Sequence, residues 1–163
     1  MHRLLVALFF TLSSVFAAPC VYNAHTGGYQ LMWWVDREQP GSFTGVGFGA
    51  NMGAGLDVII VSAPQGVSMP QVIDASVRGY TRPTRDAING VSAISSTLMS
   101  GTLNAVFTRP LSQRDGVNRD LDGCVMWNFI SGPGVANADG SFGKHRSRPE
   151  QQQQCAVAAR CTL

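Results

Sequence analysis

The fold is decided by the stretch Gly45-Val46-Gly47-Phe48-Gly49-Ala50-Asn51-Met52-Gly53-Ala54-Gly55-Leu56-Asp57, which is followed directly by Val58-Ile59-Ile60-Val61. Val46 and Phe48 alternate with glycines, which is the two-residue period of a half-buried strand. The glycines and Asn51 supply residues that adopt positive backbone torsions, as a turn requires. The stretch predicts a strand, a turn with Met52 at its tip, and a second, buried strand. The glycines leave room there for a flat ligand or another backbone to come close.

Working outward from this stretch, the chain repeats the same pattern of short apolar runs between turn residues. No run after the first 18 residues has a convincing 3.6-residue period, so helices are not expected. The loop 36–42, which contains Pro40-Gly41, is expected to be a hairpin connection into the opening stretch. The pattern predicts an all-β protein with an immunoglobulin-like antiparallel β-sandwich. Besides the opening strand, the expected strands are residues 29–35, 56–62, 72–77, 91–99, 102–108 and 124–130.

Residues 1–18 have the pattern of a secretory signal peptide. His2 and Arg3 precede an apolar run from residue 4 to 10, and small residues follow at Ala17 and Ala18. This apolar run is too short for a membrane span, and no later stretch approaches the required length. We therefore expect a secreted, extracellular protein with no membrane span.

Four cysteines remain after the expected cleavage: Cys20, Cys124, Cys155 and Cys161. An even number in an oxidising compartment predicts two disulfides, and all three connectivities stay open. Cys124 begins an expected strand and the others flank the domain, so bridges that tie the tails to the sandwich are the natural expectation. The sandwich is expected over residues 19–148. The polar tail 149–163 contains a glutamine run and is expected to be mobile except where a disulfide holds it.

Composition and motifs exclude several function classes. The chain has 12 Lys and Arg against 10 Asp and Glu, a net charge of +2, which predicts neither a nucleic-acid nor a membrane partner. His25 and His145 are the histidines left after cleavage, and there is no Gly-X-Ser-X-Gly elbow or closely spaced metal-ligand set. The glycines of the opening stretch do not open a helix, so they are not a dinucleotide fingerprint. We do not expect the chain to be an enzyme on its own.

Four features together resemble a known family. They are the Gly-Phe-Gly turn with Met52 and Asp57, the aromatic run Trp33-Trp34-Val35, the run Phe107-Thr108-Arg109-Pro110-Leu111, and a histidine, His145, after the last expected core strand. This set resembles DOMON domains, extracellular β-sandwiches related to the cytochrome domain of cellobiose dehydrogenase and to the dopamine β-hydroxylase N-terminal domain. One departure is that Asp57 lies two residues further from the methionine than in the family pattern.

The resemblance implies a secreted, haem b-binding domain that acts as a one-electron carrier. It implies that Met52 and His145 are the two axial ligands of the haem iron. Phe48, Trp34 and Arg146 are the further candidate cofactor-binding residues, and Lys144 and Arg148 are candidates to pair with the propionates. A thioether and an imidazole give six-coordinate iron with no site open for oxygen, which suits electron transfer to an extracellular redox partner.

A second hypothesis belongs to a different class. Some members of the family lack haem, and such a domain would be an extracellular module that binds a sugar or another small ligand, or that mediates adhesion. Trp33 and Trp34 are the candidate stacking surface for this function.

Overall fold

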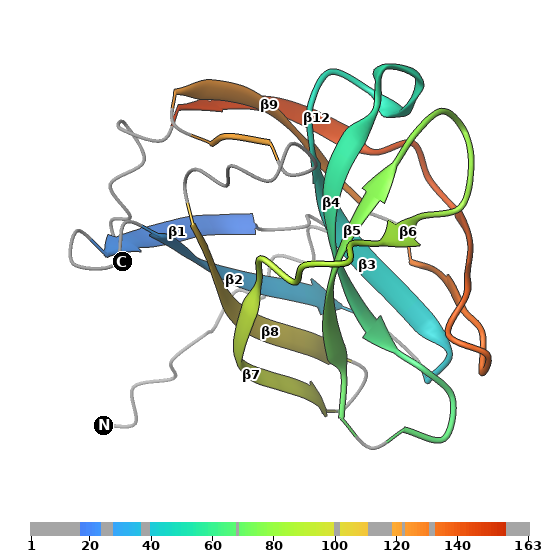
Figure 1. Ribbon diagram of the computed structural model, residues 1–163. Coiled ribbons are helices and arrows are strands. Elements are labelled where there is room, and N and C mark those ends of the chain that lie inside the picture. The colour runs from blue at the N-terminus through green and yellow to red at the C-terminus, as the bar shows by residue number, and fades with distance from the viewer. Residues whose placement is uncertain are drawn as a thin grey trace, which may run out of the picture.

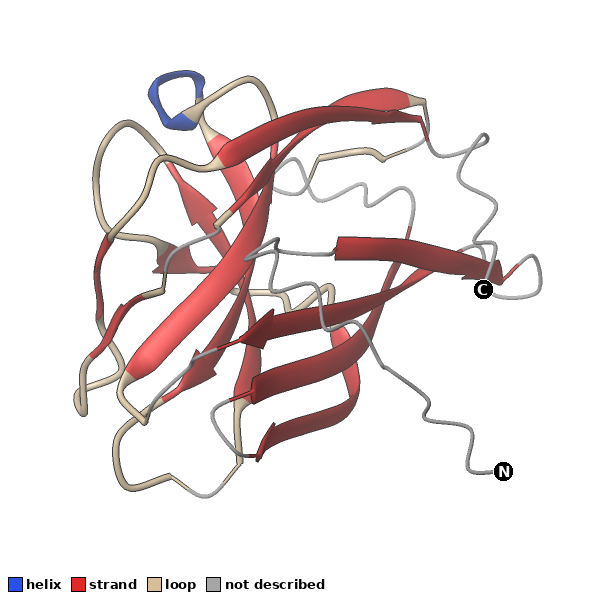
Figure 2. Cartoon of the chain, turned by 180° about the vertical axis from the view of Figure 1, so that it is seen from behind, coloured by secondary structure: helices blue, strands red, loops and turns tan. Residues whose placement is uncertain are grey.

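The computed structural model describes residues 17–23, 28–36, 40–67, 69–99, 102–110, 119–121, 123–130 and 133–155, and for residues 17–36 it defines the backbone alone. Most of these residues lie in strands (Figure 1). One short 3-10 helix, η1 (Met52–Ala54), lies between β3 and β4 and is drawn in blue in Figure 2. The strands are β1 (Ala17–Asn23), β2 (Gly28–Asp36), β3 (Ser42–Phe48), β4 (Leu56–Ala63), β5 (Gln71–Val77), β6 (Thr84–Arg85), β7 (Ser92–Met99), β8 (Thr102–Pro110), β9 (Cys124–Phe129), β10 (Gly134–Ala136), β11 (Phe142–His145) and β12 (Glu150–Cys155).

The strands form two antiparallel sheets. The first has the order β1-β2-β8-β7, and the second has the order β11-β10-β3-β4-β5-β6, with β9 also paired to β3 and β12 paired to β9. The sheets pack face to face, so the expected all-β sandwich is confirmed (Figures 1 and 2). β8 ends at Pro110, as expected of a residue that has no amide hydrogen to donate to the ladder.

The second sheet is apolar on both of its faces. Along β4, Ile59 and Val61 point into the core between the sheets, where β8 contributes Leu103 and Phe107. The alternate residues of β4 point outward and belong to a separate apolar cluster. Every residue of β4 is buried, as the β-branched run predicts. The outer cluster comprises Phe43, Leu56, Val58, Ile60, Ile73, Ala75, Val77, Ala136 and Phe142.

β3 is the strand at which the second sheet divides. One edge of β3 pairs with β4 along its whole length, whereas its other edge pairs with β10 at Ser42–Phe43 and with β9 at Val46–Phe48. At the fork between them, the Ile130 N–H donates to the Gly45 carbonyl (3.0 Å) and the Thr44 hydroxyl donates to the Ile130 carbonyl (3.0 Å). The ribbon β9–β12 and the ribbon β10–β11 diverge from this point (Figure 1).

The expected hairpin across residues 36–42 is wrong. β2 pairs with β1 and β8 in the first sheet, whereas β3 belongs to the second, so this segment crosses from one sheet to the other. Turn residues such as Pro40-Gly41 indicate a change of chain direction, but they do not determine which sheet the next strand joins.

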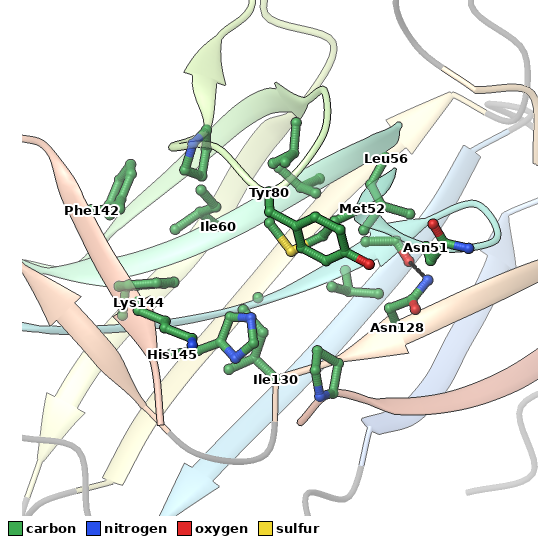
Figure 3. Close-up of a pocket in the computed structure, with 18 of the residues that line it drawn as sticks. Asn51, Met52, Leu56, Ile60, Tyr80, Asn128, Ile130, Phe142, Lys144 and His145 are labelled. Carbon is green, nitrogen blue, oxygen red and sulfur yellow. Dashed lines mark hydrogen bonds between the residues drawn. The ribbon is translucent and has the colours of Figure 1, made fainter. Parts of the chain in front are cut away.

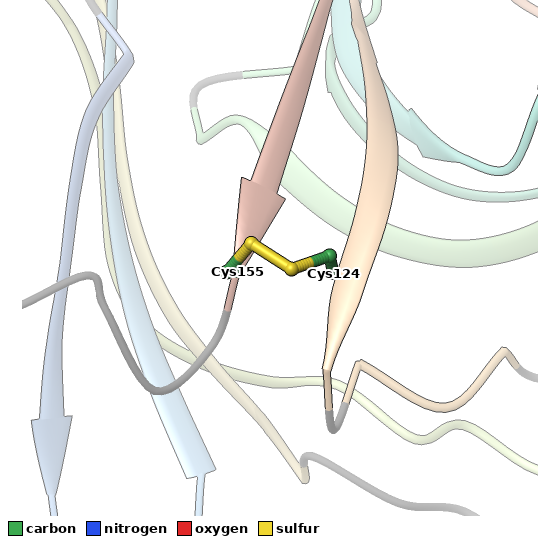
Figure 4. The surroundings of a disulfide bond; sticks show 2 residues. All are labelled: Cys124 and Cys155. Atoms are coloured by element: carbon green, nitrogen blue, oxygen red, sulfur yellow. A yellow bond between two sulfur atoms is a disulfide. The ribbon is translucent and has the colours of Figure 1, made fainter.

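The glutamine run is a strand rather than a mobile tail. Glu150–Cys155 pairs with β9 in continuous antiparallel register, from Glu150↔Phe129 to Cys155↔Cys124. The backbone of the run completes the β9 ladder while its side chains stay largely exposed, so it joins the sheet without burying apolar surface. A disulfide between Cys124 and Cys155 closes the pair, with their Cα atoms 3.8 Å apart (Figure 4). Cys161 and the side chain of Cys20 lie outside the described residues.

Candidate functional site

A pocket of about 1130 Å³ opens on the outer face of the second sheet (Figure 3). Its floor is formed by β3 and β4, and one end is closed by η1. One wall is the loop 80–83, and the opposite wall is β11 with the segment that follows it, residues 142–149. This volume slightly exceeds the range of about 300 to 1,000 Å³ that is typical of ligand pockets.

The floor of the pocket is apolar and partly bare of side chains. Leu56, Val58 and Ile60 of β4 line it, and Gly45 and Gly47 of β3 lie beside them. A Cβ atom at Gly45 would lie 2.5 Å from the Ile59 carbonyl oxygen, and one at Gly47 would lie 3.0 Å from Leu56 Cδ1. The glycines of the opening stretch are therefore required by the close approach of β4, as one of the two expectations for them stated. Because these glycines have no side chains, they also leave space above the floor of the pocket.

Met52 lies at one end of the pocket, where its backbone is firmly held. The Asn51 side chain accepts a hydrogen bond from the Ala54 N–H (3.0 Å) and so caps η1. The Met52 carbonyl accepts from the Gly55 N–H (3.1 Å) and from the Gly79 N–H (2.9 Å), which joins η1 to the loop that carries Tyr80. The longer spacing between Met52 and Asp57 is accommodated because the first residues of this segment form η1 and because Gly55 adopts φ 90°.

His145 lies at the end of β11, and its half-buried side chain lines the same pocket. Its Nδ1 atom is 2.6 Å from the Ser147 carbonyl oxygen. A carbonyl oxygen only accepts hydrogen bonds, so Nδ1 carries a proton, and in the neutral form of the ring Nε2 keeps a lone pair. The hydrogen bond from Nδ1 to the Ser147 carbonyl fixes the orientation of the ring, as is usual for histidines that ligate metals. Figure 3 shows the Met52 and His145 side chains in one pocket.

Of the other expected cofactor-binding residues, one lines the pocket, one does not, and the side chain of the third is not described. Arg146 lines the pocket together with Arg82, Lys144 and Arg148. Phe48 does not, because residues one position apart on a strand point to opposite faces, and Phe48 lies in the core between the sheets. Its ring packs edge-on against Trp127, with centroids 5.0 Å apart. The side chain of Trp34 lies outside the described part of the chain.

Two residues of the family-like motifs meet in the interior rather than at the pocket. Asp57 of β4 and Arg109 of β8 form an ion pair whose side chains are buried. Arg109 also donates to the Arg119 carbonyl (2.8 Å), and the Arg119 N–H donates to the Asp57 carboxylate (2.6 Å). The Arg109 guanidinium lies 4.7 Å from the centre of the Phe48 ring. These contacts join the two sheets, so Asp57, Arg109 and Phe48 have a structural role.

Burial raises the pKa of the Asp57 carboxyl from 3.8 to about 6, because loss of hydration outweighs the attraction of Arg109 and the Arg119 N–H. Between these two pH values the folded protein therefore binds more protons than the unfolded chain. The Asp57 carboxyl therefore contributes up to about 3 kcal/mol to the free energy of unfolding. This contribution is fully present below about pH 4 and is lost as the pH rises through about 6. Urea unfolding of the wild type and of Asp57→Leu/Arg109→Met, which lacks the titrating group, tests this. The wild type should lose stability relative to the variant from pH 4 to 7, and a relative gain would contradict the shift.

A pair of amides that the sequence analysis did not single out holds the loop before Met52. The Asn128 Nδ2 atom donates to the carbonyls of Gly47 (3.2 Å) and Gly49 (2.8 Å). Gln151 of β12 donates from Nε2 to the Asn128 Oδ1 atom (2.7 Å) and to the Ala50 carbonyl (3.0 Å). The sequence signal for Gln151 is weak, because a glutamine run is typical of unstructured segments. Both amides also line the pocket.

Replacing Gln151 by alanine is expected to lower the free energy of unfolding by about 1 kcal/mol, since the Asn128 and Ala50 oxygens lose a donor at a partly exposed site. Replacing the exposed Gln152, on the same strand but without a place in the pocket, is the matched control and should change stability by less than about 0.5 kcal/mol. Urea unfolding of both variants tests this. Equal effects would show that Gln151 has no special role.

Comparison with known proteins gives a result at the level of the fold. No protein-family model matches the chain, and no curated protein matches its sequence. Among solved structures, the cytochrome domain of Myriococcum thermophilum cellobiose dehydrogenase, MtCYT, is similar with a TM-score of 0.56 and 10% sequence identity. The match covers 80% of this chain and 66% of that one, just under two thirds of its length. At this identity, the likeness shows a shared β-sandwich fold.

Two further observations bear on the kind of site. Within the described residues, no group of three or more His, Cys, Asp or Glu side chains is placed to hold a metal ion. A thioether and imidazole pair does not require such a group. In the part of the chain that the structure describes, no helix is both long and apolar enough to cross a membrane.

Proposed function

We propose that this protein binds one haem b in the pocket on the outer face of the second sheet, with Met52 and His145 as axial ligands, and that it carries single electrons. The observation that carries the proposal is that both side chains line one apolar pocket, although they come from opposite halves of the chain. A resemblance of motifs alone did not require both side chains to line the same pocket.

The residues of the pocket fit this group chemically. The apolar floor formed by Leu56, Val58 and Ile60 would contact the macrocycle and exclude water. The four cations of the walls, Arg82, Lys144, Arg146 and Arg148, are the counter-charges that two propionates need. When bound, haem supplies a one-electron couple, and a methionine ligand raises its potential.

Hydrogen bonds to the His145 ring and to the Met52 backbone support their proposed role as ligands. The Ser147 carbonyl holds the Nδ1 proton of His145, which orients the ring and leaves Nε2 to ligate. Hydrogen bonds from Gly55 and Gly79 to the Met52 carbonyl fix the backbone of the other ligand. The amides of Asn128 and Gln151 hold the loop that leads to it. Binding would therefore require little rearrangement of the backbone, which favours affinity.

The solved neighbour and the disulfide agree with this proposal. The neighbour is a cytochrome domain in its own protein. The Cys124–Cys155 disulfide is typical of proteins in an oxidising compartment, which supports secretion. An extracellular electron carrier would satisfy both observations.

A titration of the purified protein with haemin tests the proposal. The expected result is a sharpened and shifted Soret band that saturates at one haem per chain, with the split visible bands of a low-spin ferrous state after reduction. A spectrum that stays that of free haemin would reject haem binding.

A haem-free binding module is the second candidate, and one observation favours it. Tyr80 lies in the wall of the pocket with 85% of its surface exposed, where its ring is free to stack on a sugar. If the protein stays colourless, a glycan array with the wild type and Tyr80→Ala decides this candidate. Sugar binding that the substitution abolishes would support it.

A further inference from the structure

The mouth of the pocket carries cations on both of its walls. Arg82 is on one wall, and Lys144, Arg146 and Arg148 follow one another at every second position on the other. All four are exposed, whereas the intervening His145 and its alternate neighbours are partly buried. The exposed cations therefore lie around the partly buried His145 at the mouth of the pocket.

Among the residues that the structure describes, no carboxylate lines this pocket. In the described part of the chain, Lys144, Arg146 and Arg148 form no ion pair. The nearest acids in sequence, Asp139 and Glu150, lie outside the lining. Two hydrogen bonds from Ser141 lower the pKa of Asp139, and the charge of Arg82 adds a smaller effect, so Asp139 offsets Arg82 in part.

This arrangement is strongly polarised for a chain whose net charge is +2. Four of the 12 basic residues of the chain surround one opening, and none of the acidic residues that the structure describes lines it. Two propionates of a bound haem would match two of the four cations, so the mouth would stay positive after loading. A field of one sign at an opening with apolar walls attracts partners of the opposite sign and raises their association rates by about 10-fold to 10³-fold.

We infer that the rim formed by Arg82, Lys144, Arg146 and Arg148 is a docking surface for a protein with an acidic face, which exchanges electrons with the chain at the mouth of the pocket. The exchange rests on the proposed function: one electron passes between the haem iron and the one-electron redox centre of the partner, so that one is oxidised as the other is reduced. The docking itself depends on the protein side chains alone.

Two charge-reversal variants test the inference at equal net charge. Lys144→Glu/Arg148→Glu reverses two rim cations, and the control Arg78→Glu/Arg85→Glu reverses two exposed cations outside the pocket lining. In the first arm, immobilised poly-L-glutamate is the probe and binding is measured at low ionic strength. The wild type and the control should bind, while the rim variant should bind at least about tenfold more weakly. Equal loss in both variants, or no binding by the wild type, would overturn the inference.

A second arm uses the haem-loaded, reduced protein and two small one-electron oxidants of opposite charge, ferricyanide and hexaammineruthenium(III). Each oxidant takes one electron from the ferrous protein and is itself reduced. The rate constant with ferricyanide should fall about tenfold in the rim variant and much less in the control, and should fall with added salt. The ruthenium reagent should show the opposite trends. If haem binds but the rates do not distinguish rim from control, docking is wrong and the proposed function stands. If haem does not bind, the proposed function fails and the poly-L-glutamate arm still decides docking.

Discussion

Replacing Asp57 by leucine is expected to lower the free energy of unfolding by about 3–5 kcal/mol at pH 7. The substitution leaves the Arg109 guanidinium in the core with its side chain at 0% exposure and without its counter-ion. Arginine does not lose its proton in proteins, so the charge cannot be discharged. Urea unfolding measures the loss, with the exposed Arg85→Met as a surface control that should change stability by less than about 0.5 kcal/mol.

The two partners of this ion pair should respond unequally. Arg109→Met leaves Asp57 unpaired, but that carboxyl can take up a proton because burial already raises its pKa to about 6. Arg109→Met should therefore cost less than Asp57→Leu, and Asp57→Leu/Arg109→Met should recover most of the larger loss. Additive losses in the double variant would show that the two side chains are not energetically coupled.

Replacing His145 by alanine is expected to weaken haem binding by at least about 100-fold. Loss of a hydrogen-bond partner of a metal ligand already lowers metal affinity by about 10-fold to 100-fold, and loss of the ligand itself should lower it further. Met52→Ala should reduce affinity less and leave high-spin iron with a lower potential. Haemin titration and redox potentiometry measure these effects. His25→Ala and Met69→Ala are the matched controls, since Met69 is exposed and outside the pocket lining. Variants that bind haemin with the wild-type spectrum would contradict the assignment.

The class of fold was predictable because it depends on local periodicity. The alternation of Val46 and Phe48 with glycines and the run from Val58 to Val61 determine β3 and β4 with little help from the rest of the chain. Sheet membership was not predictable, since the path across residues 36–42 depends on which distant strands pair. The strand formed by the glutamine run was also missed, because its stability comes from the β9 ladder and the disulfide.

The candidate site was predictable only in part. Met52, His145 and Arg146 were named from motifs, and all three line one pocket. Phe48 was named as a candidate cofactor-binding residue, but its side chain lies in the core between the sheets, and the alternation along β3 carries that information. The support from Asn128 and Gln151 connects three strands and a loop, so no local pattern indicates it.

If Met52 and His145 ligate one haem iron, X-ray absorption at the iron edge of the haem-loaded protein should detect both ligands. We expect one sulfur neighbour and one imidazole nitrogen in the wild type, with the sulfur lost in Met52→Ala and the imidazole nitrogen lost in His145→Ala. A wild-type spectrum without a sulfur neighbour, or one that neither substitution changes, would rule out this pair of ligands.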